Sequence, residues 1–467
     1  MRDRGRRGAA LAAALALGAL LGAAPGPARA APAGTAEGLR AGGPAGQVGR
    51  APGEPPAAPG GSASGSAGYQ PRGREIRGTA DPRDAPPMSA GESYVDSVGA
   101  GEKRSYRVRL DERSTAYVSA VAVPRPGARV SAFTDGVKLT LTDAGGRVCG
   151  QAHPVAEAAD VAYPLAGYAS RLLRSGPAAT CRQAGTYHFT VERTGADRAG
   201  ADRWPLELRF TQEPAVRGGP TTPPSPGSWD TRPPAPPTGT ARQAAGGTGF
   251  RDAGPLSPGV WRTRLKPGET RFFRIPLDWG QQLYAETELP DAPGGKRLGP
   301  LGDALGAGLY NPARGLVQYG RFTSYGGTRA TEALDLTAPV AYGNRYARAK
   351  AAVAAMSVSG QYYLAVTVHP DAGRYFPDGV PVTLRISVRG GGQPGPEYDG
   401  DGTGDGFGLS RQDRRATAEN GTAAEREGDH AGRRAVAYAG FGAGTALLAG
   451  LALWTLATRR RAPSAPD

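Results

Sequence analysis

A ten-residue stretch of this chain occurs twice, 167 positions apart. "GEKRSYRVRL" covers residues 101–110 and "GETRFFRIPL" covers residues 268–277, with five identities. Four further blocks match in the same order: residues 115–124 with 281–290, 139–148 with 307–317, 185–191 with 360–366, and 204–210 with 380–386. Matched blocks in a conserved order predict a duplicated domain.

The repeated blocks alternate between apolar and polar residues, as half-buried strands do. In the first copy Tyr106, Val108 and Leu110 share one side, which leaves Arg107 on the other. Arg274 is its counterpart in the second copy, and we expect both arginines to face solvent. Short strands punctuated by Gly, Pro and Asp, without a convincing amphipathic helix, predict an all-β chain with two tandem β-sandwich domains, each of two facing sheets.

Three motifs of the first copy, "GEKRSYRVRL", "LTDAGGRV" and "GTYHFTV", resemble the bacterial pre-peptidase C-terminal domain. The resemblance extends over both copies and implies a small jelly-roll-like β-sandwich of the kind appended to secreted enzymes and surface proteins. It implies an accessory or binding role and supplies no catalytic residue. The layout of the whole chain is similar to that of membrane-anchored envelope proteins of actinobacteria.

The first thirty residues have the three parts of a secretory signal peptide. Arginines begin the segment, an apolar run follows, and Ala28 and Ala30 supply the small residues of a cleavage site. Because Arg6 and Arg7 are adjacent, both the general secretory route and the twin-arginine route remain open.

Residues 435–458 form an uncharged apolar stretch near the C-terminus. At about 1.5 Å per residue, a helix of this length crosses a hydrocarbon core of about 30 Å. Arg459, Arg460 and Arg461 follow directly and are typical of a cytoplasmic flank. We expect a single-pass protein of the cell membrane, with its bulk outside the cell and its short C-terminal tail in the cytoplasm.

Segments rich in Ala, Gly, Pro and Ser lie between these parts, and this composition predicts disorder or extended spacers. The Pro-rich linker is expected to separate the two modules and not to pack against them. The expected segments are a signal peptide (1–30), a disordered segment (31–87), a first β-sandwich module (88–214), a Pro-rich linker (215–247), a second β-sandwich module (248–390), a juxtamembrane linker (391–434), a transmembrane helix (435–458) and a cytoplasmic tail (459–467).

The chain has two cysteines, Cys149 and Cys181, and both lie in the exported first copy. An oxidising location favours a disulfide between them. On the chain-entropy model, closing a loop of this length stabilises the fold by about 3–4 kcal/mol. The matching positions of the second copy are Val317 and Met356, which we expect to form an apolar contact.

The formal net charge is +14, of which the signal peptide and the C-terminal tail contribute +6. The remaining excess is spread over a long chain, so it serves solubility or favours weak contact with anionic wall polymers or lipid head groups. No basic stripe interleaved with aromatic residues occurs, and nucleic acid is therefore not an expected partner.

Familiar catalytic motifs do not occur in the sequence. It contains no G-x-S-x-G elbow, no H-E-x-x-H and no Walker lysine loop. Glu102 and Glu269 recur at the start of the duplicated strand, but closing a turn explains them more simply than acid catalysis. We expect no enzyme activity and no cofactor.

One acidic stretch, "DGDGTGDGFG" at residues 399–408, has the oxygen spacing of a calcium loop. The candidate ligands are Asp399, Asp401 and Asp405. Ser410 occupies the twelfth position, where a bidentate glutamate is usual, and no helices are expected beside the loop. The sequence therefore favours an acidic flexible linker, with calcium binding as the alternative.

A Gly-rich stretch from residue 315 to residue 327 is the predicted contact surface. Its candidate side chains are Tyr319, Arg321, Phe322 and Tyr325, since Tyr and Arg are favoured at recognition surfaces. The alternative is a long loop that packs these rings on its own module.

The predicted function is non-enzymatic. We expect two β-sandwich modules at the cell surface that contact an envelope protein or a wall polymer, as an accessory to secretion or envelope assembly. A carbohydrate-binding module is the alternative, with Tyr94 and Trp261 at matched positions as candidates if their rings are exposed. An unrecognised hydrolase is the third possibility, and it would need a pocket that joins a histidine to a carboxylate.

Overall fold

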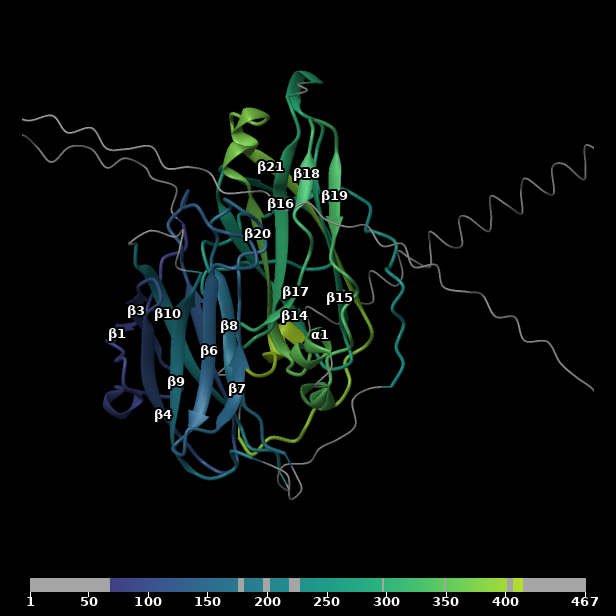
Figure 1. Ribbon diagram of the computed structural model, residues 1–467. Coiled ribbons are helices and arrows are strands. Elements are labelled where there is room, and N and C mark those ends of the chain that lie inside the picture. Colours follow the sequence, from purple (N-terminus) through teal and green to yellow (C-terminus); the bar gives the residue numbers. More distant parts are fainter. Residues whose placement is uncertain are drawn as a thin grey trace, which may run out of the picture. The chain divides into compact units, whose positions relative to one another are not determined.

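The computed structural model describes residues 68–174, 180–195, 202–217, 227–295, 298–347, 350–400 and 406–414. This part of the chain is mostly β-structure and forms four sheets. Two sheets come from each copy of the repeat, so the protein contains two tandem β-sandwich modules (Figure 1). Module 1 contains strands β1 to β10, and module 2 contains strands β11 to β21.

Module 1 has two five-stranded sheets, which we name after β3 and β4. β1 and β2 run parallel to their neighbours, and all other pairs in this module are antiparallel. The β3 sheet has the order β1 (Arg74–Glu75), β3 (Ser93–Val98), β10 (Trp204–Glu213), β5 (Thr115–Ala122) and β8 (Leu165–Arg171). The β4 sheet has the order β2 (Pro87–Met88), β4 (Lys103–Leu110), β9 (Gly185–Thr194), β6 (Gly136–Asp143) and β7 (Val148–Ala152).

Module 2 repeats this arrangement in a β13 sheet and a β14 sheet. The β13 sheet has the order β11 (Arg242–Gln243), β13 (Gly259–Leu265), β21 (Val380–Arg389), β15 (Gln282–Leu289) and β19 (Ala330–Ala333). The β14 sheet has the order β12 (Gly254–Pro255), β14 (Thr270–Leu277), β20 (Gly360–Val368), β16 (Leu301–Tyr310) and β17 (Leu316–Tyr319), and β18 (Thr323–Tyr325) pairs with β16. The helical turns are η1 (Pro82–Asp84), η2 (Pro293–Gly295), η3 (Tyr342–Tyr346), α1 (Ala351–Ala355) and η4 (Pro370–Arg374).

The two modules have the same strand order in both sheets, which confirms that the fold is duplicated. The likeness extends to single turns. Gly101 before β4 and Gly268 before β14 have φ values of 66° and 75°. Glycine adopts this left-handed region without the steric penalty of a Cβ atom, so the repeated "GE" marks the same turn twice.

Each module buries an apolar core between its own two sheets. Tyr106, Val108 and Leu110 of β4 point into the core of module 1 and are at most 2% exposed. Arg107 is exposed, as the alternation predicts. The same prediction is wrong for Arg274, which is half-buried and donates to the carbonyl of Ala253 at 2.5 Å.

The N-terminal end of module 1 begins earlier than the composition predicts. Residues 68–87 were expected to belong to a disordered segment, but they contain β1, η1 and β2. β1 pairs with β3 in one sheet and β2 pairs with β4 in the other, so this segment connects the two sheets. Backbone pairing at a sheet edge satisfies its polar groups, which apolar content alone would not reveal.

The described part of the Pro-rich linker packs against module 2, which corrects its predicted role as a free spacer. The side chains of Gln282, Arg385 and Arg389 on the β13 sheet donate to backbone carbonyls of residues 230, 237 and 232. Trp229 packs against the core of module 2. These contacts hold the extended segment across the outer face of the sheet.

The segment after β21 also packs on the modules, although it was expected to be a juxtamembrane linker. Val216 of module 1 forms a β-bridge with Tyr398, and the N–H of Asp399 donates to the carbonyl of Ala215 at 2.7 Å. Phe407 is buried against Tyr117 of module 1, with ring centroids 5.5 Å apart. Residues 391–400 and 406–414 therefore join the end of module 2 to module 1.

The predicted signal peptide, transmembrane helix and cytoplasmic tail lie outside the described residues. Within the described ranges, no helix has the length and apolar character needed to cross a membrane.

The repeated glutamates close the turns before β4 and β14. Glu102 Oε2 accepts the N–H of Gly99 at 2.7 Å, and Glu269 Oε2 accepts the N–H of Lys266 at 2.7 Å. Burial opposes the ionisation of Glu102, but the Gly99 N–H, Arg203 and Arg104 outweigh it and lower the pKa of this carboxyl. The turn-closing role is therefore the one that the geometry supports.

Glu102→Gln should make module 1 less sensitive to acid. Because the folded-state pKa of Glu102 is lowered, its ionisation stabilises the fold above the ordinary value of 4.5, and this contribution is lost as the pH falls through the folded-state pKa. We expect Glu102→Gln to cost about 1 kcal/mol at pH 7 and progressively less below pH 4.5, measured by urea unfolding. Glu112→Gln, an exposed control on the same module, should cost little at either pH. A cost of Glu102→Gln that is the same at pH 7 and pH 3 would contradict this role.

Candidate functional site

The two modules meet through one sheet of each. Strands β5 and β8 of module 1 contribute Val121 and Ala166, and strands β14, β16 and β20 of module 2 contribute Phe272, Tyr310 and Ala365. All five side chains are buried in one cluster, and both modules belong to one compact unit. The face of β14 that alternation predicts to meet solvent therefore meets module 1.

Aromatic rings fill the centre of this junction. The ring centroid of Phe250 lies 4.9 Å from that of Phe272, 5.5 Å from that of Tyr310 and 5.1 Å from that of Tyr363. Tyr69, from the N-terminal segment of module 1, lies 6.3 Å from Phe250. Tilted and edge-on pairs of this kind stabilise an interface beyond the area that they bury.

The first buried ion pair of the junction joins Glu207 on β10 to Arg314. Their Oε1 and Nη1 atoms are 2.7 Å apart, and the two side chains are 2% and 3% exposed. Arg314 lies in the turn between β16 and β17, where Asn311 Oδ1 accepts the N–H groups of Ala313 and Gly315. The turn thus positions an arginine of module 2 against a carboxylate of module 1.

The second buried ion pair joins Glu213, at the end of β10, to Arg345 in η3. The contact is bidentate, at 2.5 and 2.8 Å, and both side chains are 1% exposed. The hydroxyl of Tyr398 donates to the same carboxylate at 2.5 Å. Burial opposes the charge on the guanidinium, but Glu213 outweighs it and raises the pKa of Arg345. The pair is therefore charged, and it is complete only while the modules are in contact.

The charged residues of the junction were not predicted from the sequence, although one signal was present. Phe272 and Phe273 are adjacent on β14, and Tyr362 and Tyr363 are adjacent on β20. Two neighbouring aromatic residues in a strand place apolar groups on both faces, which indicates a sheet that is covered on both sides.

Two members of the predicted contact surface belong to this junction. Phe322 and Tyr319 of module 2 pack against Tyr163 of module 1, with ring centroids 5.7 and 6.3 Å away. The hydroxyl groups of Tyr319 and Tyr310 are 2.8 Å apart. These rings contact module 1 of the same chain, and their contribution to an external surface is correspondingly reduced.

The other two residues of the predicted contact surface, Tyr325 and Arg321, lie in different environments. Tyr325 is 2% exposed and packs edge-on against Tyr375 in module 2, as the alternative interpretation expects. Arg321 is exposed, and its backbone N–H donates to Glu332 at 2.9 Å. The four residues therefore do not form one exposed patch.

The two candidates for sugar binding are not bare exposed rings. Tyr94 is 1% exposed, and its hydroxyl accepts the N–H of Ser89 at 2.8 Å. Trp261 is half-buried, and the guanidinium carbon of Arg242 lies 3.9 Å from the ring centroid. The structure does not support these two residues as a stacking platform.

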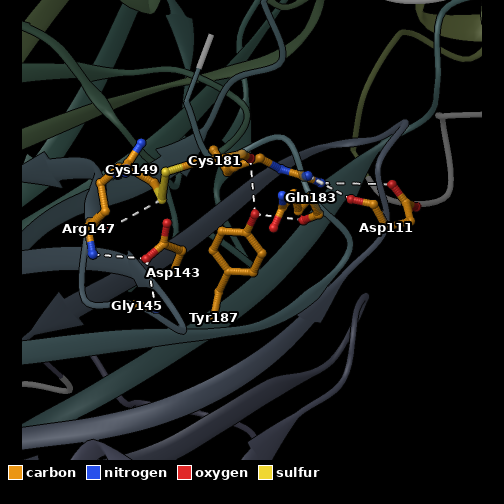
Figure 2. The surroundings of a disulfide bond; sticks show 9 residues. Asp111, Asp143, Gly145, Arg147, Cys149, Cys181, Gln183 and Tyr187 are labelled. Atoms are coloured by element: carbon orange, nitrogen blue, oxygen red, sulfur yellow. Dashed lines mark hydrogen bonds and ion pairs between the residues drawn. A yellow bond between two sulfur atoms is a disulfide. The ribbon is translucent and has the colours of Figure 1, made fainter.

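Cys149 and Cys181 form the predicted disulfide (Figure 2). The bridge joins β7 to the segment before β9, where the hydroxyl of Tyr187 donates to the carbonyl of Cys181. At the matching positions of module 2, Val317 and Met356 are both buried in the apolar core.

The grouping of potential metal ligands found in the described ranges includes this disulfide. It consists of Asp143 and the two bridged cysteines. Their sulfur atoms are bonded to each other, so they offer no thiolate to a metal ion. Asp143 instead accepts the N–H groups of Gly145 and Arg147 and closes the turn between β6 and β7 (Figure 2).

Of the predicted calcium ligands, Asp399 is described, and it forms an exposed ion pair with Arg113 at 2.8 Å. Asp401 and Asp405 lie outside the described residues. The calcium alternative therefore remains a hypothesis.

Three histidines fall within the described ranges, and each lies in a different place. His153 Nε2 contacts the hydroxyl of Thr194 at 3.0 Å, and His369 Nδ1 accepts the N–H of Asp371 at the start of η4. His188 lies on β9 opposite Arg107. The expectation that the protein is not an enzyme stays a prediction.

A cavity of about 560 Å³ lies beside the second ion pair. Trp279, Tyr398 and Phe407 contribute aromatic groups to its lining, and Asp278 and Arg414 contribute charged groups. Glycines, prolines and Gln393 complete the lining, so polar and apolar surface are about equal and the cavity differs from the mostly apolar pocket that is typical of a small-ligand site.

Comparisons with known proteins do not assign a family. No family model and no curated protein matches this chain. The pre-peptidase C-terminal domain of collagenase from Bacillus anthracis is 11% identical, covers 27% of this chain and 95% of that domain, and has a TM-score of 0.17. The CBM22-1–CBM22-2 tandem domain of Paenibacillus barcinonensis Xyn10C is 13% identical, covers 63% and 85%, and has a TM-score of 0.17. The tandem CBM51 modules of a Streptococcus pneumoniae family 98 glycoside hydrolase are 7% identical, cover 62% and 83%, and have a TM-score of 0.16. At TM-scores this low, the assignment of β-sandwich modules rests on the strand order of this chain itself.

Arg345→Met should destabilise the protein strongly, because it leaves Glu213 buried without its counter-charge. We expect a loss of about 3–5 kcal/mol in the free energy of unfolding, measured by chemical denaturation. The double variant Glu213→Gln, Arg345→Met removes both charges and should recover part of this loss. If the double variant is less stable than Arg345→Met by as much as Glu213→Gln alone destabilises the wild type, the two residues are not coupled and the prediction is wrong.

Gly315→Ala should loosen the junction, since a Cβ atom there would lie 1.9 Å from the ring of Tyr168 in module 1. We expect a cost of about 1–3 kcal/mol and faster proteolysis of the linker. Gly326→Ala is the matched control, because its Cβ would meet no atom within 4 Å. Equal effects of the two substitutions on stability would contradict the close approach.

Proposed function

We propose that this chain is a non-enzymatic interaction protein of the cell surface, in which two β-sandwich modules act as one rigid unit that contacts an envelope protein or a wall polymer. In this proposal a signal peptide exports the chain, and the apolar stretch at residues 435–458 anchors it in the membrane. Its role is accessory to secretion or envelope assembly.

The observation that carries the proposal is the junction between the modules. Two ion pairs, each with side chains at most 3% exposed, cross it together with an aromatic cluster. Buried charge pairs require defined partners, and they favour a fixed relation between two domains over a flexible one. A fixed pair of sandwiches suits the presentation of a surface at a distance from the membrane.

A test of the proposal is cross-linking of the full-length protein in its own cell envelope, followed by affinity recovery. We expect the wild-type protein to recover either a specific envelope protein or wall material. The Gly326→Ala variant should behave like the wild type, whereas Gly315→Ala should recover less. Recovery of neither, or turnover of wall material by the purified protein, would reject the proposal.

Carbohydrate binding is a second candidate function, and the cavity beside Tyr398 is the observation that favours it. Trp279 and Phe407 supply apolar surface, and Asp278 and Arg414 supply hydrogen-bonding groups. Retention on a neutral wall polysaccharide that Arg414→Gln abolishes, with unchanged unfolding, would favour this function.

A further inference from the structure

The outer face of the β4 sheet differs from the other three outer sheet faces. The junction covers residues on the outer faces of the β3 and β14 sheets, and residues 227–247 cross the outer face of the β13 sheet. Strands β4, β9, β6 and β7 lie side by side in module 1 (Figure 1). In the described ranges, no hydrogen bond or ion pair links the outward side chains of these strands to another sheet or to the linker.

This open face is polar and carries more positive than negative charge. Arg107 lies opposite His188, which lies opposite Thr142, and Arg109 lies opposite Thr186. The equivalent positions of module 2 that form the junction are apolar. Ser105 and Thr190, at outward positions of β4 and β9, correspond to the apolar pair Phe272 and Ala365. Ser105 is itself buried, and its hydroxyl lies 3.1 Å from that of Thr190. The open face is therefore not built to bury a third module in the same way.

The cations of the open face have few internal partners. Arg107, Arg109 and Lys138 form no hydrogen bond or ion pair through their side chains with the described residues. Lys103 pairs with Glu192 at 3.5 Å, and both side chains are partly exposed. Four cations thus share the face with one carboxylate, and three of them are available to an external anion.

A cavity of about 530 Å³ lies at the end of this face. Arg107, Arg109 and Thr186 form one side of it, and Met88 and Gln212 contribute to the rest of its lining. The lining includes both arginines, so the cavity gives this part of the face a concave setting.

We propose that the open face of the β4 sheet binds an extended polyol-phosphate polymer of the cell exterior, with Arg107 and Arg109 as its principal phosphate-binding residues. The inference rests on the proposed function and deepens it, since it names the polymer class and the site. Planar guanidinium groups suit bidentate recognition of phosphate, and the surrounding hydroxyl groups suit a polyol.

Spacing supports a polymer with one phosphate per six backbone bonds. Alternate residues of a strand are about 7 Å apart, so Arg107 and Arg109 present positive charges at that interval. Three backbone bonds of an extended peptide span about 3.3–3.6 Å, so an extended repeat of six bonds spans about 7 Å. Successive phosphates of such a polymer can therefore meet successive arginines.

The same face argues against two other partners. A protein interface usually has an apolar, aromatic-rich core, but Val148 is the one large apolar side chain of the described residues that is exposed on these strands. A single-stranded nucleic acid also has six backbone bonds per phosphate, but it binds proteins by stacking on aromatic rings. No tyrosine, phenylalanine or tryptophan occurs at the outward positions of β4, β9, β6 and β7.

The test uses purified full-length protein in detergent and poly(glycerol phosphate) chains of defined length, with binding measured at several salt concentrations. We expect the double variant Arg107→Gln, Arg109→Gln to weaken binding about ten- to thirtyfold and to make the salt dependence shallower. The matched control Arg262→Gln, Lys266→Gln removes two exposed cations from β13 and its following turn in module 2 and should change affinity less than about twofold. Lys138→Gln provides a second, milder variant of the site and should weaken binding by a smaller factor.

Two results would overturn the inference. One is that the site variant and the matched control lose the same affinity for poly(glycerol phosphate) while their unfolding midpoints are unchanged. The effect of charge on binding would then not depend on its position. The other is tighter binding to a single-stranded oligonucleotide than to poly(glycerol phosphate). If the protein binds no polyol phosphate but still recovers an envelope protein by cross-linking, this inference fails while the proposed function stands. If cross-linking also recovers nothing, the proposed function fails as well.

Discussion

The contact between Glu213 and Arg345 is the interaction on which the arrangement of the two modules depends. Each residue belongs to a different module, and each side chain is 1% exposed. Either charge alone would be costly to bury, so the cost is offset only when the partner module is in place. Tyr398 adds a third group to the same carboxylate and brings the segment after β21 into the junction. A sequence that encodes two sandwiches therefore also encodes their contact.

The two sandwiches share one strand order but differ in the side chains on their outer faces. At the same register, module 1 has Ser105 and Thr190 where module 2 has Phe272 and Ala365. The apolar pair faces a neighbouring sheet, whereas the polar pair lies on the outer side of the β4 sheet, where the two hydroxyl groups are 3.1 Å apart and Ser105 is buried. The strand order is unchanged, because the residues that point into each core keep their alternation. The outward side chains thus distinguish a sheet face that packs on the other module from one that does not.

Much of the fold could be predicted from the sequence, because strand alternation and the repeat are local signals. The matched blocks correspond to β4, β5, β6, β9 and β10 and to their counterparts β14, β15, β16, β20 and β21. The disulfide followed from the number of cysteines. Contacts between distant segments could not be predicted. The sequence does not reveal that Glu207 meets Arg314, or that Tyr319 packs against Tyr163, since those contacts depend on how the sandwiches stack. The prediction that the Pro-rich linker is a free spacer was wrong. A proline-rich composition indicates that a segment has no core of its own, but it does not exclude hydrogen bonds between the backbone of the segment and a neighbouring sheet.

The most direct test of the account is the distance distribution between one spin label on module 1 and one on module 2 of the full-length protein, measured by pulsed electron paramagnetic resonance. Lys138 and Arg262 are suitable exposed positions for the labels. If the buried ion pairs fix the modules, the distribution has one narrow peak, and Arg345→Met broadens it. A broad distribution in the unsubstituted protein, unaffected by Arg345→Met, would contradict the account.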